Sequence, residues 1–200
     1  MLYINQQDYP MIPYPTNADD PSSSSYIKGT VASSGCGLCC LCMVVDRLTL
    51  KELTLQEAIR LSIEHQANRK VGTNLKILGQ VVADLYGLHM STSNDTEDVK
   101  AVLRNGGCCV MNVGGDHDDH IGTFSDVGHY VLIQSFSEKG FCVMDPAYRP
   151  DKYTIPGRKG KVREDGLFLY TDAKVLQEDT LNRDPGFYLF TRKGTDTLSE

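Results

Sequence analysis

The sequence has no stretch of 18 consecutive apolar residues, and residues 1–10 show no basic region followed by an apolar segment. Neither a membrane span nor a secretory signal is therefore predicted. It also has no basic block interleaved with aromatic residues, and 20 Lys and Arg against 26 Asp and Glu leave a net charge of −6. We accordingly expect neither nucleic acid nor a membrane as a partner.

Cysteines are present, but they lack the pattern of a disulfide scaffold. There are seven, an odd number, and two pairs are adjacent within apolar runs, Cys39 with Cys40 and Cys108 with Cys109. Disulfide-rich secreted domains instead space an even number of cysteines along polar loops. The sequence therefore predicts mostly buried free thiols and a cytoplasmic location.

The length of 200 residues suits one hydrophobic core and is short for two. Residues 7–25 hold four prolines and follow neither a helical nor a strand period. We therefore expect an extended N-terminal arm over residues 1–25, packed on the body or lying across a cleft, and a single domain over residues 26–200. Nothing in the sequence indicates an oligomeric state.

Predicted helices come first and predicted strands second. Helices are expected from Cys36 to Leu48 and over residues 74–86 and 96–103. Another helix is expected to begin at Thr54, because residues 54–57 match a capping box. Short β-prone runs follow at residues 108–113, 129–136, 141–144, 167–170 and 187–191. This segregation predicts an α+β fold in which N-terminal helices pack on a C-terminal antiparallel sheet.

Cys36 is the candidate nucleophile. It lies between Gly35 and Gly37 at the expected start of a helix, where the helix dipole favours the reactive thiolate. A cysteine nucleophile needs an imidazole to transfer a proton and a third group to orient that imidazole. His129, at the start of a strand, and Asp145, at the end of the next strand, suit these roles.

The hairpin between these two strands can form in more than one register. A four-residue turn at 137–140 would place Asp145 opposite Leu132, whereas a loop over 135–139 would place it opposite His129. The sequence does not choose between the two registers. Contact between His129 and Asp145 is therefore a prediction.

Three segments resemble the signatures of the bacteriocin-processing-like cysteine peptidases of the papain-like superfamily, whose founding members cleave double-glycine leader peptides. They are Ser-Gly-Cys-Gly-Leu-Cys-Cys-Leu-Cys-Met at 34–43, Phe-Ser-Asp-Val-Gly-His-Tyr-Val-Leu-Ile at 124–133 and Val-Met-Asp-Pro at 143–146. Gly72-Thr73 and residues 103–107 also match, so the similarity covers about residues 26–146. It implies a papain-like fold, with Cys36 as nucleophile, His129 as general base and Asp145 as the orienting carboxylate.

The sequence departs from the papain-like pattern at the oxyanion site. These enzymes usually have a glutamine about six residues before the cysteine, but Thr30 stands at that position here. The backbone N–H of Cys36 is one donor, and Thr30, Ser33 or Ser34 is the candidate for a second. The predicted protein is thus a cysteine peptidase or amide hydrolase that acts on a peptide or protein through a thioester and needs no metal or other cofactor.

Three other interpretations stay open. Cys36-Gly37-Leu38-Cys39 matches the C-x-x-C motif of thiol-disulfide exchange, although a buried parallel strand before it is lacking. Residues 116–120, Asp-His-Asp-Asp-His, could bind a metal but are more typical of a mobile loop that forms a lid. The fold could also bind a peptide or acyl group without turning it over.

Overall fold

The computed structural model describes residues 1–194, and the last six residues of the predicted domain, 195–200, lie outside the described residues. Its helical elements are η1 (Gln6–Asp8), α1 (Ser24–Ile27), α2 (Val31–Ser34), α3 (Cys36–Leu48), α4 (Leu55–Glu64), α5 (Leu75–Tyr86), α6 (Thr96–Arg104) and α7 (Ala173–Thr180). Its strands are β1 (Leu88–Ser93), β2 (Cys108–Val113), β3 (His129–Ser137), β4 (Gly140–Met144), β5 (Arg163–Asp165), β6 (Phe168–Thr171) and β7 (Phe187–Arg192).

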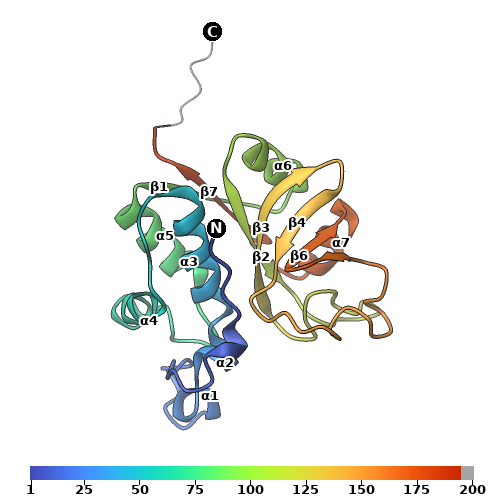
Figure 1. The fold of residues 1–200 in the computed structure, drawn as a ribbon. Coiled ribbons are helices and arrows are strands. Elements are labelled where there is room, and N and C mark those ends of the chain that lie inside the picture. The colour runs from blue at the N-terminus through green and yellow to red at the C-terminus, as the bar shows by residue number, and fades with distance from the viewer. Residues whose placement is uncertain (195–200) are drawn as a thin grey trace.

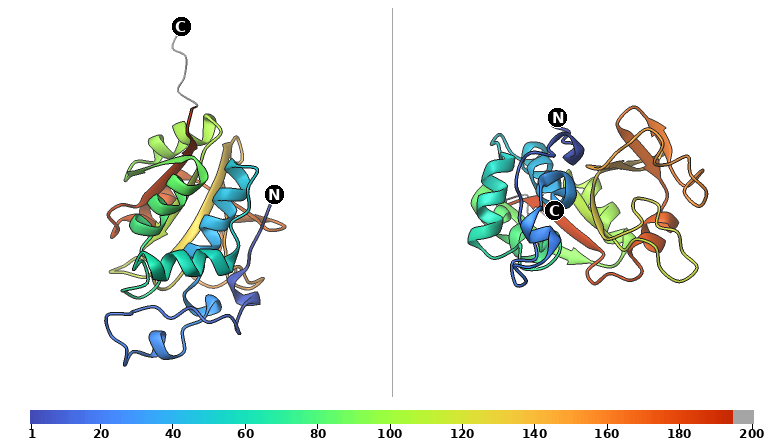
Figure 2. Two further views of the ribbon diagram at one scale, coloured as in Figure 1. Left: turned by 90° about the vertical axis from the view of Figure 1, so that its left-hand side faces the viewer. Right: turned by 90° about the horizontal axis from the view of Figure 1, so that it is seen from below.

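All seven strands form one antiparallel sheet, in the order β1-β7-β2-β3-β4-β6-β5. Helices α3, α4 and α5 lie together on one face of this sheet, and α6 and α7 lie on the other side (Figure 1). In the left-hand view of Figure 2 these helices lie in front of the strands, and in the right-hand view they lie to one side of the sheet. The predicted α+β class, with N-terminal helices on an antiparallel sheet, is confirmed.

The sheet separates two hydrophobic cores. In β2, Cys108 and Val110 pack with α3, α4 and α5, whereas Cys109 and Met111 pack with α6 and α7. This division follows from the alternation of side chains along a strand. It also explains why β2 is apolar throughout, since both of its faces are covered.

Most predicted elements are present, with two kinds of difference. The elements that were not predicted have short or polar sequences with weak patterns; they are η1, α1, α2, β1, β5 and α7. The predicted capping box is only half formed: the Thr54 hydroxyl accepts from the backbone N–H of Glu57, but the Glu57 carboxylate binds Arg60. No helix of the described residues combines the length and the apolar character of a membrane span.

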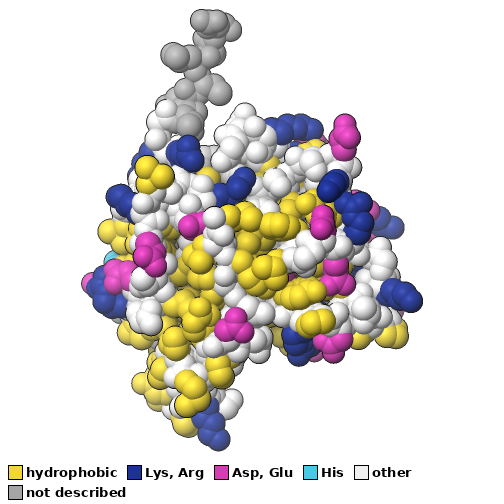
Figure 3. Space-filling view, viewed as in Figure 1, with side chains coloured by type: hydrophobic (Ala, Val, Ile, Leu, Met, Phe, Trp, Pro, Cys, Tyr) yellow, Lys and Arg dark blue, Asp and Glu magenta, His cyan; other side chains and the backbone are white. Residues whose placement is uncertain are grey.

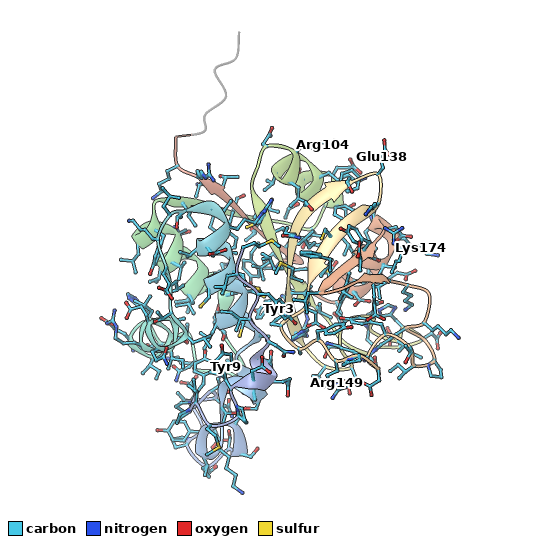
Figure 4. All side chains as sticks on the ribbon, viewed as in Figure 1. Tyr3, Tyr9, Arg104, Glu138, Arg149 and Lys174 are labelled. Carbon is cyan, nitrogen blue, oxygen red and sulfur yellow. The ribbon has the colours of Figure 1, made fainter. Side chains whose placement is uncertain are left out.

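The N-terminal arm packs between the helices and the sheet. The backbone N–H of Leu2 donates to Asp46 of α3, and the Tyr3 hydroxyl donates to the carbonyl of Asp145. Figure 4 shows Tyr3 between the two parts of the molecule. The arm therefore joins α3 to the segment that carries Asp145.

On the face in Figure 3, hydrophobic side chains gather along the middle and charged ones lie mostly at the rim.

Candidate active site

Cys36 is the first residue of α3, and His129 is the first residue of β3. The start of α3 and the start of β3 lie close to the same end of the boundary between the helices and the sheet (Figure 1). Gly37 is required beside Cys36, because a Cβ there would lie 2.9 Å from the Thr73 Cβ and 3.3 Å from the Tyr130 ring. The close packing of α3 on this region brings the thiol to the start of β3.

A cleft of about 390 Å³ opens where these two elements meet. It is lined by Ser33, Ser34, Cys36, Val71, Gly72, Thr73, Asn112, Val127, Gly128, His129, Tyr130 and Arg183. Cys36 is partly exposed as a residue, whereas His129 is buried. The structure thus places the predicted nucleophile and base on one cleft.

His129 contacts both of its predicted partners. Its Nε2 lies 2.7 Å from Oδ1 of Asp145, and its ring interacts with the Cys36 thiol and lowers the pKa of that thiol. Because Nε2 faces Asp145, Nδ1 is the nitrogen left for Cys36. The contact between His129 and Asp145 that the sequence predicts is present.

A β-bulge makes this contact possible. Near the turn, Ser137 pairs with Gly140, but the register shifts between Ile133 and Ser135, so that Leu132 pairs with Met144. Continued by one residue, this register sets Asp145 beside Val131, on the strand face that also carries His129. Neither register considered from the sequence includes this shift. Without it, Asp145 would be opposite Leu132, whose side chain points to the other face.

Asp145 is fully buried, and its carboxylate accepts four hydrogen bonds. Oδ1 accepts from His129 and from the backbone N–H of Ala147 at 2.8 Å. Oδ2 accepts from Lys152 Nζ at 2.5 Å and from the Tyr153 hydroxyl at 2.6 Å. Lys152 and Tyr153 were not predicted from the sequence, because each is a single residue in a loop without a motif.

The charges of the site favour a thiolate and an imidazolium. Burial disfavours both charged forms, but the charge of Asp145 and its hydrogen bond raise the pKa of His129 to about 9. Burial likewise acts to raise the pKa of Cys36, but the hydrogen bond and charge of His129 outweigh it, and the pKa of the thiol is lowered. Burial opposes the charge of Asp145 as well, and His129 and Lys152 together hold its pKa well below the usual range.

The other cysteines differ from Cys36. Burial raises the pKa of the Cys39, Cys40 and Cys109 thiols well above the ordinary value, and raises the pKa of Cys42 and Cys108 to about 12. All seven cysteines are free. The fully buried Cys39 counts against the thiol-disulfide exchange interpretation, which needs an accessible second thiol beside Cys36.

The residues before Cys36 have mixed roles. Thr30 and Ser33 cap α2 reciprocally, since each side chain accepts from the backbone N–H of the other residue. Thr30 does not line the cleft, whereas Ser33 and Ser34 do. Among the described residues, the Ser34 hydroxyl has one hydrogen-bond partner, the Ser33 hydroxyl at 3.2 Å. Of the three oxyanion candidates, Ser34 is thus the least committed to capping.

Two glutamines of the N-terminal arm reach the same turn of α2. Nε2 of Gln6 and Nε2 of Gln7 donate to the carbonyl of Ala32, at 2.7 and 3.1 Å. Gln6 is buried, and its Oε1 has no hydrogen-bond partner among the described residues. Papain-like enzymes usually have a glutamine about six residues before the cysteine, whereas these two lie about thirty positions before Cys36 and were not predicted from the sequence.

The loop Asp116–His120 lines a different cavity, of about 530 Å³. The buried Asp179 carboxylate anchors this loop, accepting from the backbone N–H groups of Thr123 and Phe124 and lying 2.9 Å from His120 Nε2. Within residues 1–194, no group of three or more His, Cys, Asp or Glu side chains is placed to hold a metal ion. The anchored loop leads directly into Val127 and Gly128 of the cleft.

Comparison with known proteins adds evidence on the fold. No family model matches the chain, and no curated protein matches its sequence. A crystal structure of a "putative C39-like peptidase" from Bacillus anthracis is similar, with a TM-score of 0.51 and 12% identity, covering 80% of this chain and 90% of that chain. At this identity the likeness concerns the fold alone. The protein thus has a cysteine peptidase-like fold.

Proposed function

We propose that the protein is a cysteine peptidase or amide hydrolase with Cys36, His129 and Asp145 as its catalytic triad. The observation that carries the proposal is the position of His129. Its Nε2 contacts Asp145, its ring interacts with the Cys36 thiol, and both His129 and Cys36 line one cleft. The fold of the Bacillus anthracis structure supports the same class of activity. A bacteriocin-processing role in particular stays a prediction.

The reaction follows from this geometry. The Cys36 thiolate attacks the carbonyl carbon of the scissile amide, and the carbonyl electrons move to its oxygen. His129 then donates its Nδ1 proton to the leaving amine, the C–N bond breaks and a thioester forms. Water, deprotonated by His129, attacks the thioester, and the acid product leaves as the thiolate is restored. Asp145 holds the imidazole by accepting from Nε2–H throughout.

Alkylation of the thiols at different pH values tests this proposal. We expect iodoacetamide at pH 6 to 7 to label Cys36 well before the other six cysteines, because the pKa of Cys36 is lowered and the pKa of five others is raised. The sixth, Cys142, is buried. In His129→Ala the labelling of Cys36 should shift to higher pH. Peptide mass spectrometry gives the site, and His65→Ala, at an exposed position, is the control.

The pH dependence of hydrolysis adds a second measurement. The pKa of His129 is raised to about 9, so the imidazolium that protonates the leaving amine persists up to that pH and is lost above it. We expect kcat/KM to rise with formation of the thiolate and to fall as the pH passes about 9.

In the labelling experiment, equal labelling of all seven thiols, or unchanged labelling in His129→Ala, would contradict the proposed pair of Cys36 and His129.

The second oxyanion donor belongs to the junction of the N-terminal arm with α2. The first candidate is the Ser34 hydroxyl, which lines the cleft. The second is the Gln6 carboxamide, which does not line the cleft but donates to the carbonyl of Ala32, one turn before Cys36. We expect replacement of the true donor by alanine to lower kcat about 10²-fold to 10³-fold without changing Cys36 labelling. A loss in Gln6→Ala alone assigns Gln6, and a loss in Ser34→Ala alone assigns Ser34. Full activity in both variants would refute a donor at this junction.

A further inference from the structure

The cleft has an uneven distribution of charge. Arg183, in the segment between α7 and β7, is the single Lys or Arg among its lining residues, which include neither Asp nor Glu. The guanidinium lies against the residue that precedes the candidate base: a Cβ added to Gly128 would be 2.7 Å from Nη2 of Arg183. A positive charge therefore lies beside His129 within the substrate cleft.

Backbone carbonyls hold this guanidinium on one side. Nε of Arg183 donates to the carbonyl of Val113 at 3.2 Å, and Nη2 donates to that of Gly114 at 3.3 Å. These contacts fix its position and leave Nη1 without a hydrogen-bond partner in the described part of the chain. An arginine fixed in this way loses little conformational entropy when it binds a ligand.

No carboxylate neutralises Arg183 in the described part of the chain, since none lies within 4.0 Å of it. Asp184, its neighbour in sequence, instead accepts from the Asn94 side chain at 3.0 Å. Buried or partly buried arginines are usually paired with an anion. The partial burial of Arg183, its free Nη1 and its place in the cleft together indicate an anionic partner that comes with the substrate.

We propose that Arg183 determines specificity by binding a carboxylate of the substrate close to the scissile bond, so that the preferred substrates are acidic peptides. This inference rests on the proposed hydrolase function. Hydrogen bonds to a charged group contribute about 1.5–3 kcal/mol, which corresponds to a preference of about 10-fold to 100-fold over a neutral side chain. A lysine on the substrate at the same position would be repelled.

Cleavage of a peptide library tests the preference. Each position around the scissile bond carries Glu, Gln or Lys in turn, and kcat/KM is compared for the wild type, Arg183→Gln and Arg183→Glu. We expect the preference for Glu over Gln at one position to fall at least 10-fold in Arg183→Gln, and Arg183→Glu to prefer Lys there. Lys159→Glu, an exposed site outside the cleft, is the control for net charge. An unchanged ratio of Glu to Gln substrates in both Arg183 variants would overturn the proposal.

A second measurement does not depend on hydrolysis. Iodoacetate and iodoacetamide differ by one carboxylate, so the ratio of their rates at Cys36 reports the charge of the cleft. We expect this ratio to fall several-fold in Arg183→Gln, further in Arg183→Glu, and not in Lys159→Glu. If no peptide is cleaved while the ratio falls, the hydrolase function fails and the anion-binding role of Arg183 stands. A ratio that does not change refutes that role even if peptides are cleaved.

Discussion

Cys36→Ala is expected to lower kcat/KM for peptide hydrolysis by a factor on the order of 10⁴ or more, because the variant has no nucleophile to form the thioester. The variant should still fold, since Cys36 is a small, partly exposed residue at the start of α3 and joins neither core cluster. Hydrolysis is measured with a peptide that the wild type cleaves, and folding by circular dichroism. The same protein should still bind the uncleaved peptide.

Asp145→Asn separates orientation of the imidazole from the supply of a nucleophile. An amide oxygen can still accept from His129 Nε2–H but carries no charge to stabilise the imidazolium. We expect a smaller loss of kcat than in Cys36→Ala, together with a lower pKa for the descending limb of the pH profile.

Full activity of Cys36→Ala would exclude this centre as the site of reaction and would leave the peptide-binding interpretation of the fold.

Lys152→Met is expected to lower the free energy of unfolding by about 3–5 kcal/mol, because it removes one partner of a buried ion pair. The Lys152 and Asp145 side chains are almost entirely inaccessible, and Nζ lies 2.5 Å from Oδ2. In the variant that oxygen keeps only the Tyr153 hydroxyl. Urea unfolding monitored by circular dichroism measures the change, with Lys159→Met as a control at an exposed lysine.

A double variant distinguishes loss of the ion pair from loss of packing. If loss of the Lys152 charge beside Asp145 causes the instability, adding Asp145→Asn to Lys152→Met should restore part of the lost stability. If the loss comes from the lysine methylenes, the two changes should simply add. A loss below about 1 kcal/mol in Lys152→Met would show that the pair contributes little.

Local patterns in the sequence were sufficient for most helices and strands. The apolar spacing from Cys36 to Leu48 predicted α3, and Gly87, in the left-handed region at φ 71°, ends α5 as expected. Strand β2 was predicted with its observed bounds, because a continuous β-prone run lies between Gly107 and Gly114. These features depend on residues within one or two turns of each other, which is why they can be found without a fold.

Features that join distant segments were not predicted. Gln6, Lys152 and Arg183 carry no motif, and each gains its role from a contact with α2, Asp145 or the cleft. The distance in sequence from Gln6 to Cys36 is bridged by an arm that the sequence described only as extended. A contact of this kind depends on how the arm packs against the rest of the chain, and no local pattern records that packing.

The sequence by itself determined the residue types of the candidate centre, their order and the elements on which they lie. The tertiary structure decided that they meet. The shift of register between Ile133 and Ser135 turns Asp145 to the face of His129, and the packing of α3 on the sheet brings Cys36 to the same cleft. A single residue in a bulge reverses the face of every residue beyond it, and that choice depends on the packing of both cores, not on the hairpin alone.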